Sequence, residues 1–508
     1  EGGTIFQISA LRIDITNCPN LTFICVDEGE RPNIQSTINY LGLQDQVQVN
    51  SYCTFTPGGT FYSASGSIQF DYNANGCDSG DFLVPFQQFS ITNGIETSTI
   101  ISNGTGSYSA YVGAGTHTIT PIIENPASFT VSPSQLTVNF PLQNSPVLQD
   151  FCISAGSELH DFDIMLIPMT NAIPGSDSTY KLVYKNTGNI VDNGSIILSF
   201  EDDVLDFISS SLAPVTNSAG ILTWSFTNLM PFETRSIDLT FNLNGPMETP
   251  PLNLLDILSF SSSIGESAAI FPFLNNHVLT QTVLNSFDPN DKTCLEGNIV
   301  GAEMIGEYVH YVIHFENTGT FPAQNIVVKD IIDISKFDVS TLIPISGSHQ
   351  FETRISSGNK VEFIFENIML PFDDATNDGY VAFKIKTLPS LEIGDTFSNS
   401  ASIYFDYNFP IVTNTATTVI EQLSTNDFEF EDQFTLYPNP AQEVLKIKTL
   451  NGGEINSVSF YNTLGQVVLV VTDISTDEPI DVSHLNAGSF FIKINSPKGN
   501  TISKFVKQ

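Results

Sequence analysis

The chain has 508 residues and is strongly acidic: 18 Lys and Arg oppose 55 Asp and Glu, which gives a formal net charge of −37. Such a charge repels nucleic acids and anionic membranes, so we expect neither as a partner. No apolar run reaches the roughly 18 residues of a membrane span, and Glu1 is not an initiator Met, so we expect a processed or truncated start. The length suits about four or five domains. Helical periodicity is nearly absent, which predicts an all-β chain.

Residues 1–55 differ from the rest because apolar residues recur there at the spacing of a leucine-rich repeat. The pattern comprises Leu11, Ile13, Ile15, Asn17, Cys18 and Leu21, and it continues through Ile24 and Val26. A solenoid needs several repeats to bury its apolar face, and this stretch supplies one or two. It therefore resembles the end of a leucine-rich repeat array with its closing cap. The alternative is an irregular β-rich leader.

Residues 56–151 contain a loop with oxygen-bearing side chains at every second position, followed by a glycine. This is the spacing of a calcium loop. The expected ligands are Asp71, Asn73, Asn75, the carbonyl of Cys77, and Asp78 or Asp81, with Ca²⁺ as the cofactor. Phe82 stands where such loops carry a bidentate acid, so a plain Asn/Gly turn remains the alternative. With the strand at residues 113–121, the region resembles the prealbumin-like B-repeats of bacterial surface proteins, which act as rigid spacers.

Residues 152–285 and 286–420 are two copies of one pattern. An Asn-Thr-Gly triplet at residues 186–188 returns 131 residues later at 317–319, residues 226–232 return as 365–372, and residues 258–264 return as 397–403. Both copies resemble the Ig-like repeat domains of bacterial surface proteins. The resemblance implies tandem β-sandwiches. The second copy also contains Phe287–Lys292 and Tyr404–Ile411, and through these segments it resembles a domain that often precedes the C-terminal sorting signal of exported proteins.

Residues 421–433 contain five acidic residues and no basic one, which indicates a flexible acidic linker. Residues 434–508 are neutral, with six Lys, no Arg and six acidic residues. Short runs of alternating apolar residues separated by turns predict a small antiparallel sandwich there.

The same terminal block carries motif residues in a fixed order. These are Tyr437, Pro438, Asn439, Pro440, Leu445, Ile447, Gly465, Val467, Gly488, Phe490, Lys504, Phe505, Val506 and Lys507. They resemble the C-terminal sorting domain of type IX secretion cargo in Bacteroidota, apart from Phe490, where that family more often has Tyr. The resemblance implies export across the outer membrane to the cell surface or the medium. It also implies recognition by the type IX translocon and its shuttle protein. An ordinary terminal Ig-like module is the alternative.

Six cysteines allow 15 pairings. We expect a Cys25–Cys53 bond to seal the end of the repeat array and a Cys77–Cys152 bond to bracket the calcium-loop module. Cys18 and Cys294 would stay free. The alternative is six thiols.

Nucleophile elbows, phosphate loops and the His or Cys spacings of zinc sites are not recognisable, and we expect no enzymatic activity. His310 and His314 form the only close His pair, but four residues along a strand span roughly 13 Å, too far for one metal. The sequence therefore predicts an exported surface protein. Alternatives are an adhesin that binds glycans or another surface ligand through its leucine-rich or Ig-like modules, and an accessory of a catalytic domain encoded upstream.

Overall fold

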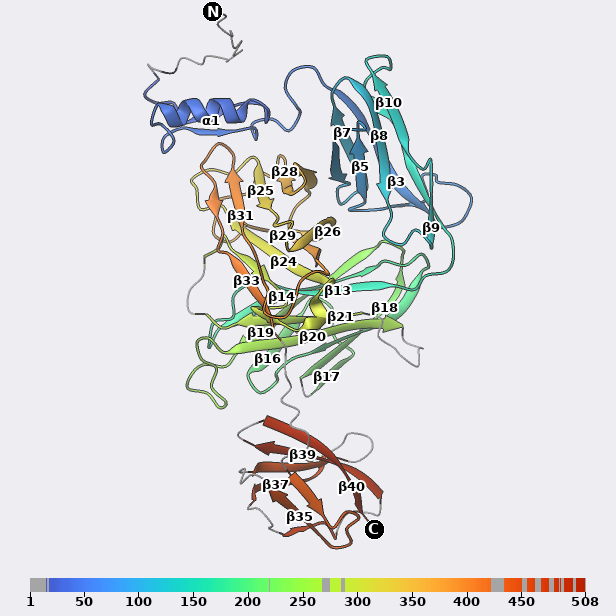
Figure 1. Cartoon of the computed structure of the whole chain (residues 1–508), viewed down its shortest axis with the longest axis vertical. Coiled ribbons are helices and arrows are strands. Elements are labelled where there is room, and N and C mark those ends of the chain that lie inside the picture. The colour runs from blue at the N-terminus through green and yellow to red at the C-terminus, as the bar shows by residue number, and fades with distance from the viewer. Residues whose placement is uncertain are drawn as a thin grey trace, which may run out of the picture. The chain divides into compact units, whose positions relative to one another are not determined.

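The computed structural model describes residues 15, 18–218, 220–266, 275–284, 288–421, 434–449, 455–461, 467–474, 479–483, 485, 488–496 and 499–507. These residues form two compact units, Glu1–Glu421 and Gln422–Gln508. Strands dominate both units, so the prediction of an all-β chain is confirmed, apart from one short α-helix and the 3-10 helix Ala302–Met304 among the described residues (Figure 1).

The N-terminal part of the larger unit is a strand–helix–strand element. Strands β1 (Phe23–Cys25) and β2 (Gln48–Asn50) pair in parallel, and Phe23 lies opposite Gln48. Helix α1 (Arg31–Tyr40) connects them, with a proline in its first turn, where a missing N–H costs nothing. Ile34 and Ile38 of the helix pack on Val47 and Val49. Residues 1–14, 16 and 17 of the leucine-rich pattern lie outside the described residues.

The next module, residues 62–155, is a sandwich with one aromatic core. Its strands are β3 (Tyr62–Asp71), β4 (Phe82–Leu83), β5 (Gln88–Thr92), β6 (Thr97–Ile101), β7 (Ser107–Val112), β8 (Gly115–Ile122), β9 (Phe129–Ser132), β10 (Leu136–Phe140), β11 (Val147–Leu148) and β12 (Phe151–Ala155). The expected boundary between residues 151 and 152 is misplaced, because it cuts β12. That strand pairs with β3 and β9, so the module continues to Ala155.

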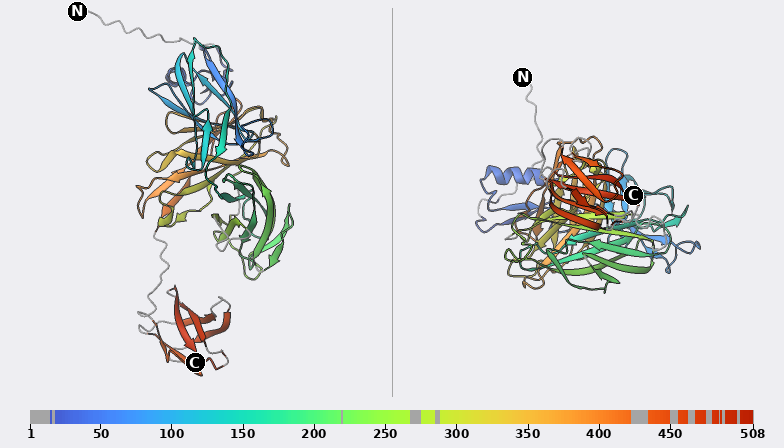
Figure 2. Two further views of the ribbon diagram at one scale, coloured as in Figure 1. Left: turned by 90° about the vertical axis from the view of Figure 1, so that its right-hand side faces the viewer. Right: turned by 90° about the horizontal axis from the view of Figure 1, so that it is seen from below.

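Copy 1 is a two-layer sandwich, visible as green strands in Figure 2. One sheet has the order β13-β14-β19-β16 and the other β17-β18-β15-β20-β21. The strands are β13 (Phe162–Pro168), β14 (Asp177–Asn186), β15 (Asp192–Ser199), β16 (Leu205–Ser210), β17 (Thr216–Ser218), β18 (Ile221–Leu229), β19 (Thr234–Leu243), β20 (Ile257–Glu266) and β21 (Asn275–Thr282).

Copy 2 repeats this topology. Its first sheet has the order β22-β24-β29-β26, and its second contains the run β27-β28-β25-β31-β32. The strands are β22 (Lys292–Cys294), β23 (Ile299–Val300), β24 (Tyr308–Glu316), β25 (Ile326–Ile331), β26 (Phe337–Gly347), β27 (Glu352–Ser356), β28 (Lys360–Phe365), β29 (Asp378–Thr387), β30 (Thr396–Asn399), β31 (Ala401–Phe405), β32 (Ile411–Val412) and β33 (Ala416–Ile420). The matching strand orders support the internal duplication.

The modules of the larger unit are joined side by side as well as end to end. Strand β6 pairs with β27, so module 62–155 and copy 2 share one nine-stranded sheet. Lys384 of copy 2 binds Asp163 of copy 1 at 2.6 Å. The N-terminal element contacts copy 2 through the hydroxyl of Tyr52, which donates a 2.6 Å hydrogen bond to Glu362. The body is therefore one packed unit.

The C-terminal unit is a small sandwich of two sheets, ordered β34-β35-β38 and β37-β36-β39-β40. Its strands are β34 (Phe434–Tyr437), β35 (Val444–Thr449), β36 (Ile455–Tyr461), β37 (Val467–Ile474), β38 (Pro479–Asp481), β39 (Gly488–Ser496) and β40 (Gly499–Lys507). Leu445, Ile447, Val458 and Ile492 are fully buried between the sheets. The alternating pattern read from the sequence thus places its apolar side inward.

Candidate functional site

The two ends of the terminal block meet in the folded C-terminal unit. The side-chain amide of Asn439 donates a 2.9 Å hydrogen bond to the carbonyl of Lys504, and the amide of Val506 donates one of 2.9 Å to Asn439 Oδ1. The amide of Ala441 donates to the carbonyl of Val506 at 3.0 Å. Motif residues that are 65 or more positions apart therefore form one site.

Some motif residues build the core of this unit. Leu445 and Ile447 are completely buried, and the ring of Phe490 packs on that of Phe505 with centroids 6.0 Å apart. Phe490 is only 8% exposed, so the hydroxyl of a tyrosine at this position would be attached to a largely buried ring. These residues hold the two sheets together and cannot contact a partner directly.

Other motif residues lie on the surface. Tyr437, Pro438, Asn439, Pro440 and Lys504 are exposed, Val506 is half-buried, and Lys507 is largely buried. Gly488 opens β39 and is also exposed. Val467 opens β37, and Gly465 lies outside the described residues. We call the exposed set Tyr437–Pro440 with Lys504 the motif face.

The expected calcium loop follows β3 and is folded by its own side chains. Asp71 accepts hydrogen bonds from the amides of Asn75 (3.1 Å) and Gly76 (2.9 Å), and Asn73 Oδ1 accepts one from Asn75 (3.0 Å). The amide of Asp78 donates to Asp81 Oδ2 at 2.8 Å. Such bonds are typical of Asx turns and stabilise the loop without a cation.

One oxygen of the loop lacks a partner. Asp81 is only 9% exposed, and its Oδ1 accepts no hydrogen bond from any described group. Buried carboxylate oxygens ordinarily bind a donor or a cation. Three ligands of one ion must bring one oxygen each within about 4.8 Å of one another. Asp71, Asp78 and Asp81 do not meet this condition. The carboxylates of the loop would therefore have to move closer together to bind one Ca²⁺ ion.

Both expected disulfide pairs come together in the structure. Cys77, within the acidic loop, is bonded to Cys152 of β12, with Cα atoms 5.6 Å apart. Cys25 of β1 is bonded to Cys53, with Cα atoms 6.1 Å apart. Cys18 and Cys294 carry free thiols, the first exposed and the second buried.

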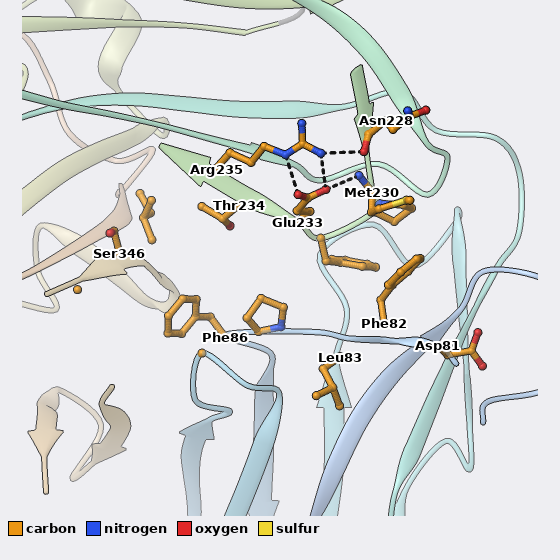
Figure 3. Close-up of a pocket in the computed structure, with 16 residues that line it drawn as sticks. Asp81, Phe82, Leu83, Phe86, Asn228, Met230, Glu233, Thr234, Arg235 and Ser346 are labelled. Atoms are coloured by element: carbon orange, nitrogen blue, oxygen red, sulfur yellow. Dashed lines mark hydrogen bonds and ion pairs between the residues drawn. The ribbon is translucent and has the colours of Figure 1, made fainter. Parts of the chain in front are cut away.

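A pocket of about 740 Å³ lies where three modules meet (Figure 3). Phe82, Leu83 and Phe86 come from module 62–155 and face residues 228–235 of copy 1, while residues 345–347 of copy 2 close one side. Arg235 crosses the wall, binding Glu233 at 2.7 Å and donating to the carbonyl of Asn228 at 2.8 Å. The pocket thus combines aromatic faces with fixed polar groups.

A histidine cluster joins the two copies, and the sequence analysis missed it. His310 and His314 do lie apart, but His310 Nδ1 contacts Glu296 at 2.6 Å, and Nε2 of His277, from copy 1, lies 3.9 Å from the same carboxylate oxygen. Burial, and then the charge of His310, lower the pKa of His277 to about 3. Burial alone would raise the pKa of Glu296, but the charge and hydrogen bond of His310 lower it.

The tautomer of His277 argues against a metal ion in this cluster. The backbone amide of Leu166 donates to His277 Nδ1 at 3.4 Å, so the neutral ring carries its proton on Nε2. Nε2 lies 3.9 Å from Glu296 and makes no hydrogen bond with a described group, and in this tautomer it cannot act as a metal ligand. The cluster serves as a polar contact between the copies.

Comparisons with known families match two segments of the chain. Residues 435–508 match the secretion system C-terminal sorting domain, and residues 288–419 match a domain of unknown function (DUF7619). No curated protein matches the chain. The second segment coincides with copy 2.

Three of the similar solved structures come from streptococci and from S. aureus. The C-terminal domain of the Streptococcus agalactiae AgI/II polypeptide BspA is 8% identical, with 51% of this chain and 100% of that chain covered and a TM-score of 0.20. That of the Streptococcus pyogenes antigen I/II-family protein AspA is 10% identical, with 51% and 99% covered and a TM-score of 0.20. The collagen adhesin (CNA) from S. aureus is 14% identical, with 52% and 92% covered and a TM-score of 0.19. Likenesses this weak carry no argument about this chain.

The terminal match agrees with the motif residues and with the folded unit that they build. In the part of the chain that the structure describes, no helix is long and apolar enough to cross a membrane. The chain therefore carries a type IX C-terminal sorting domain, and it is exported to the cell surface or the extracellular space.

Proposed function

We propose that the motif face is the surface by which the type IX translocon and its outer-membrane shuttle protein recognise this cargo. The observation that carries the proposal is the meeting of the two motif ends: Asn439 fixes β40 by two hydrogen bonds, which places Lys504 beside residues 437–440. A partner that contacts this face would thereby read both ends of the domain at once. Only a folded and complete sorting domain would present it.

Point variants with matched controls test this proposal. Tyr437→Ala and Lys504→Ala remove exposed side chains of the motif face, whereas Val444→Ala and Lys448→Ala remove exposed side chains of β35 outside it. We expect several-fold less protein outside the cell for the first pair and normal export for the second. Equal export of all four variants would contradict the proposal. Hydrogen exchange of the purified chains shows whether each variant remains folded.

We further propose that the body acts by binding rather than by catalysis, as an adhesin for a glycan or another surface ligand. The junction pocket supports this, because it joins Phe82 and Phe86 to a polar wall held by Arg235. Sugars are bound by stacking on aromatic faces together with oriented hydrogen bonds. Copy 1 contributes most of the polar wall, so an Ig-like module would take part in binding.

Binding of the full chain to an immobilised panel of oligosaccharides tests the adhesin proposal. We expect Phe86→Ala to weaken whatever binding is found, since its ring lines the pocket. Ile95→Ala is the control, because Ile95 is 92% exposed and lies outside the pocket lining. Absence of any binding, or equal losses in both variants, would count against the pocket.

Two further proposals concern the N-terminal half. We propose that residues 1–55 end a leucine-rich array; the 25-residue spacing of the paired Phe23 and Gln48 falls within the 20–29 residues of such repeats. The gene sequence upstream of Glu1 tests this, and a region without repeats of that period would contradict it.

For the acidic loop we propose Ca²⁺ bound by Asp71, Asn73, Asn75, the Cys77 carbonyl, Asp78 and Asp81. The unpartnered Oδ1 of Asp81 supports a cation there. Addition of Ca²⁺ should raise the Tm of the chain by mass action, and a chelator should reverse the change. A Tm that responds to neither would favour the plain turn.

A further inference from the structure

Three polar side chains lie together in the apolar core of copy 2. Lys292 of β22 and Asp330 of β25 are 0% exposed, and Asn399 of β30 is 5% exposed. The Lys292 ammonium pairs with Asp330 Oδ2, and the Asn399 amide donates a 3.2 Å hydrogen bond to the same oxygen. One carboxylate oxygen therefore contacts both nitrogen atoms.

Aromatic rings lie beside this triad. The ring of Tyr311 lies 4.9 Å and the ring of Phe383 5.2 Å from Lys292 Nζ. Asp330 Oδ1 accepts no hydrogen bond from any group that the structure describes. Burial removes both charges from water, and the attraction within a buried ion pair often does not repay this loss of hydration. Stability alone does not explain these residues.

Copy 1 shows that the fold does not need them. Lys292 lies opposite Ile313, which corresponds to Leu182 of copy 1. The residue opposite Leu182 is Leu166, so Leu166 takes the place of Lys292. Asp330 lies opposite Ala401, which corresponds to Ser262 of copy 1. The residue opposite Ser262 is Leu198, so Leu198 takes the place of Asp330. Asn399 corresponds to Phe260 in the aligned segments 397–403 and 258–264. Copy 1 thus fills the three positions with buried apolar side chains.

Burial also sets the protonation states for chemistry. Burial lowers the pKa of the Lys292 amine, against the opposing charge of Asp330. Burial raises the pKa of Asp330, against the opposing charge of Lys292. Both directions favour transfer of the proton from nitrogen to oxygen, which leaves a neutral amine beside a carboxylic acid. A neutral, desolvated lysine is a nucleophile.

We propose that copy 2 contains an intramolecular amide crosslink between the side chains of Lys292 and Asn399, formed with Asp330 as the proton carrier. Lys292 Nζ attacks Asn399 Cγ, the Nζ–Cγ bond forms and the Cγ–Nδ2 bond breaks. The amine gives up one proton and the departing nitrogen gains one, so ammonia leaves. Asp330 Oδ2, in contact with both nitrogens, transfers that proton and is regenerated, and no oxidant or reductant is needed.

The position of the crosslink suits an exported protein. It would join β22, the first strand of copy 2, to β30 near its end, across 399 − 292 = 107 positions. A covalent link over so long a segment restricts the unfolded chain strongly, as a disulfide does, but cannot be reduced. Copy 2 would then stay closed under reducing conditions that open the two disulfides.

The intact mass of the full chain, measured with its disulfides reduced, tests this proposal. We expect a mass lower than that of the sequence by one ammonia, and a proteolytic fragment in which the peptides containing Lys292 and Asn399 are joined. Asp330→Asn should restore the full mass, because the proton carrier is lost. The triple variant Lys292→Leu, Asp330→Leu, Asn399→Phe, which copies the residues of copy 1, should also show the full mass and remain folded.

Several results would overturn the proposal. A wild-type mass equal to that of the sequence excludes the crosslink, whether or not any variant folds. Loss of one water instead of ammonia would place the bond at Asp330. Loss of ammonia mapped to an Asn-Gly step such as Asn75-Gly76 would indicate a succinimide and no crosslink.

Discussion

Removal of the Asn439 side chain should loosen the last strand of the sorting domain. Asn439→Ala deletes the hydrogen bond to the Lys504 carbonyl and the one from the Val506 amide, each 2.9 Å long. A net contribution of about 1 kcal/mol for each bond gives a loss of about 2 kcal/mol. That corresponds to roughly 30-fold faster amide exchange in residues 499–507, if these amides exchange through opening of β40.

Hydrogen exchange measured on the full chain by mass spectrometry is the assay. Gln442→Ala, an exposed position three residues along, is the control and should leave exchange unchanged. Asn439→Asp keeps an acceptor for the Val506 amide but loses the donor to Lys504, so we expect an intermediate effect. Exchange of residues 499–507 that is the same in Asn439→Ala and wild type would refute the idea that Asn439 holds the two motif ends together.

Three other changes probe the body, with the fluorescence of the buried Trp224 as the readout of unfolding. Cys77→Ser should lower the free energy of unfolding by about 2–4 kcal/mol, since the bond to Cys152 spans 75 positions, and no loss in non-reducing buffer would contradict the pairing. Phe232→Ala should cost about 2 kcal/mol, because this half-buried ring packs on module 62–155, and a neutral result would exclude that contact as a stabilising one. The pKa of His277 is about 3 in the folded chain and 6.5 ordinarily, so only the unfolded chain gains a proton as pH falls from about 6.5 to 3. Stability should fall by roughly 2–5 kcal/mol across that window, and His277→Gln should reduce this fall; an equal fall in both would refute the assignment.

The sequence was sufficient for features that depend on local patterns. Alternation of apolar residues, as at Leu445 and Ile447, reports one buried face of a strand and so predicts the sandwich. The repeated Asn-Thr-Gly triplet showed the duplication, because each triplet marks the same turn. Both cysteine pairs were expected because they bracket recognisable modules.

Contacts between modules could not be predicted in this way. The pairing of β6 with β27 joins strands that are some 250 positions apart, and neither strand differs from an ordinary edge strand in sequence. His277 meets His310 only because the two copies pack against each other. The misplaced boundary at residue 151 has the same origin, since β12 gains its partners from strands far upstream.

The same distinction between local patterns and contacts made by the fold applies to the site residues. The motif residues of the sorting domain were recognisable by order and type, but the hydrogen bonds of Asn439 that bring their two ends together depend on the fold. Lys292, Asp330 and Asn399 carry no spacing signal at all. A comparison of the two copies, position by position, would have revealed them as polar residues that replace an apolar core.

The most direct test of the account is the location of the chain with and without its sorting domain. A chain that ends at Glu421 retains the whole packed body and loses residues 422–508. We predict that the full chain is found outside the cell and that the shortened chain, although folded, stays inside the outer membrane. Export of the shortened chain at the level of the full chain would contradict the account.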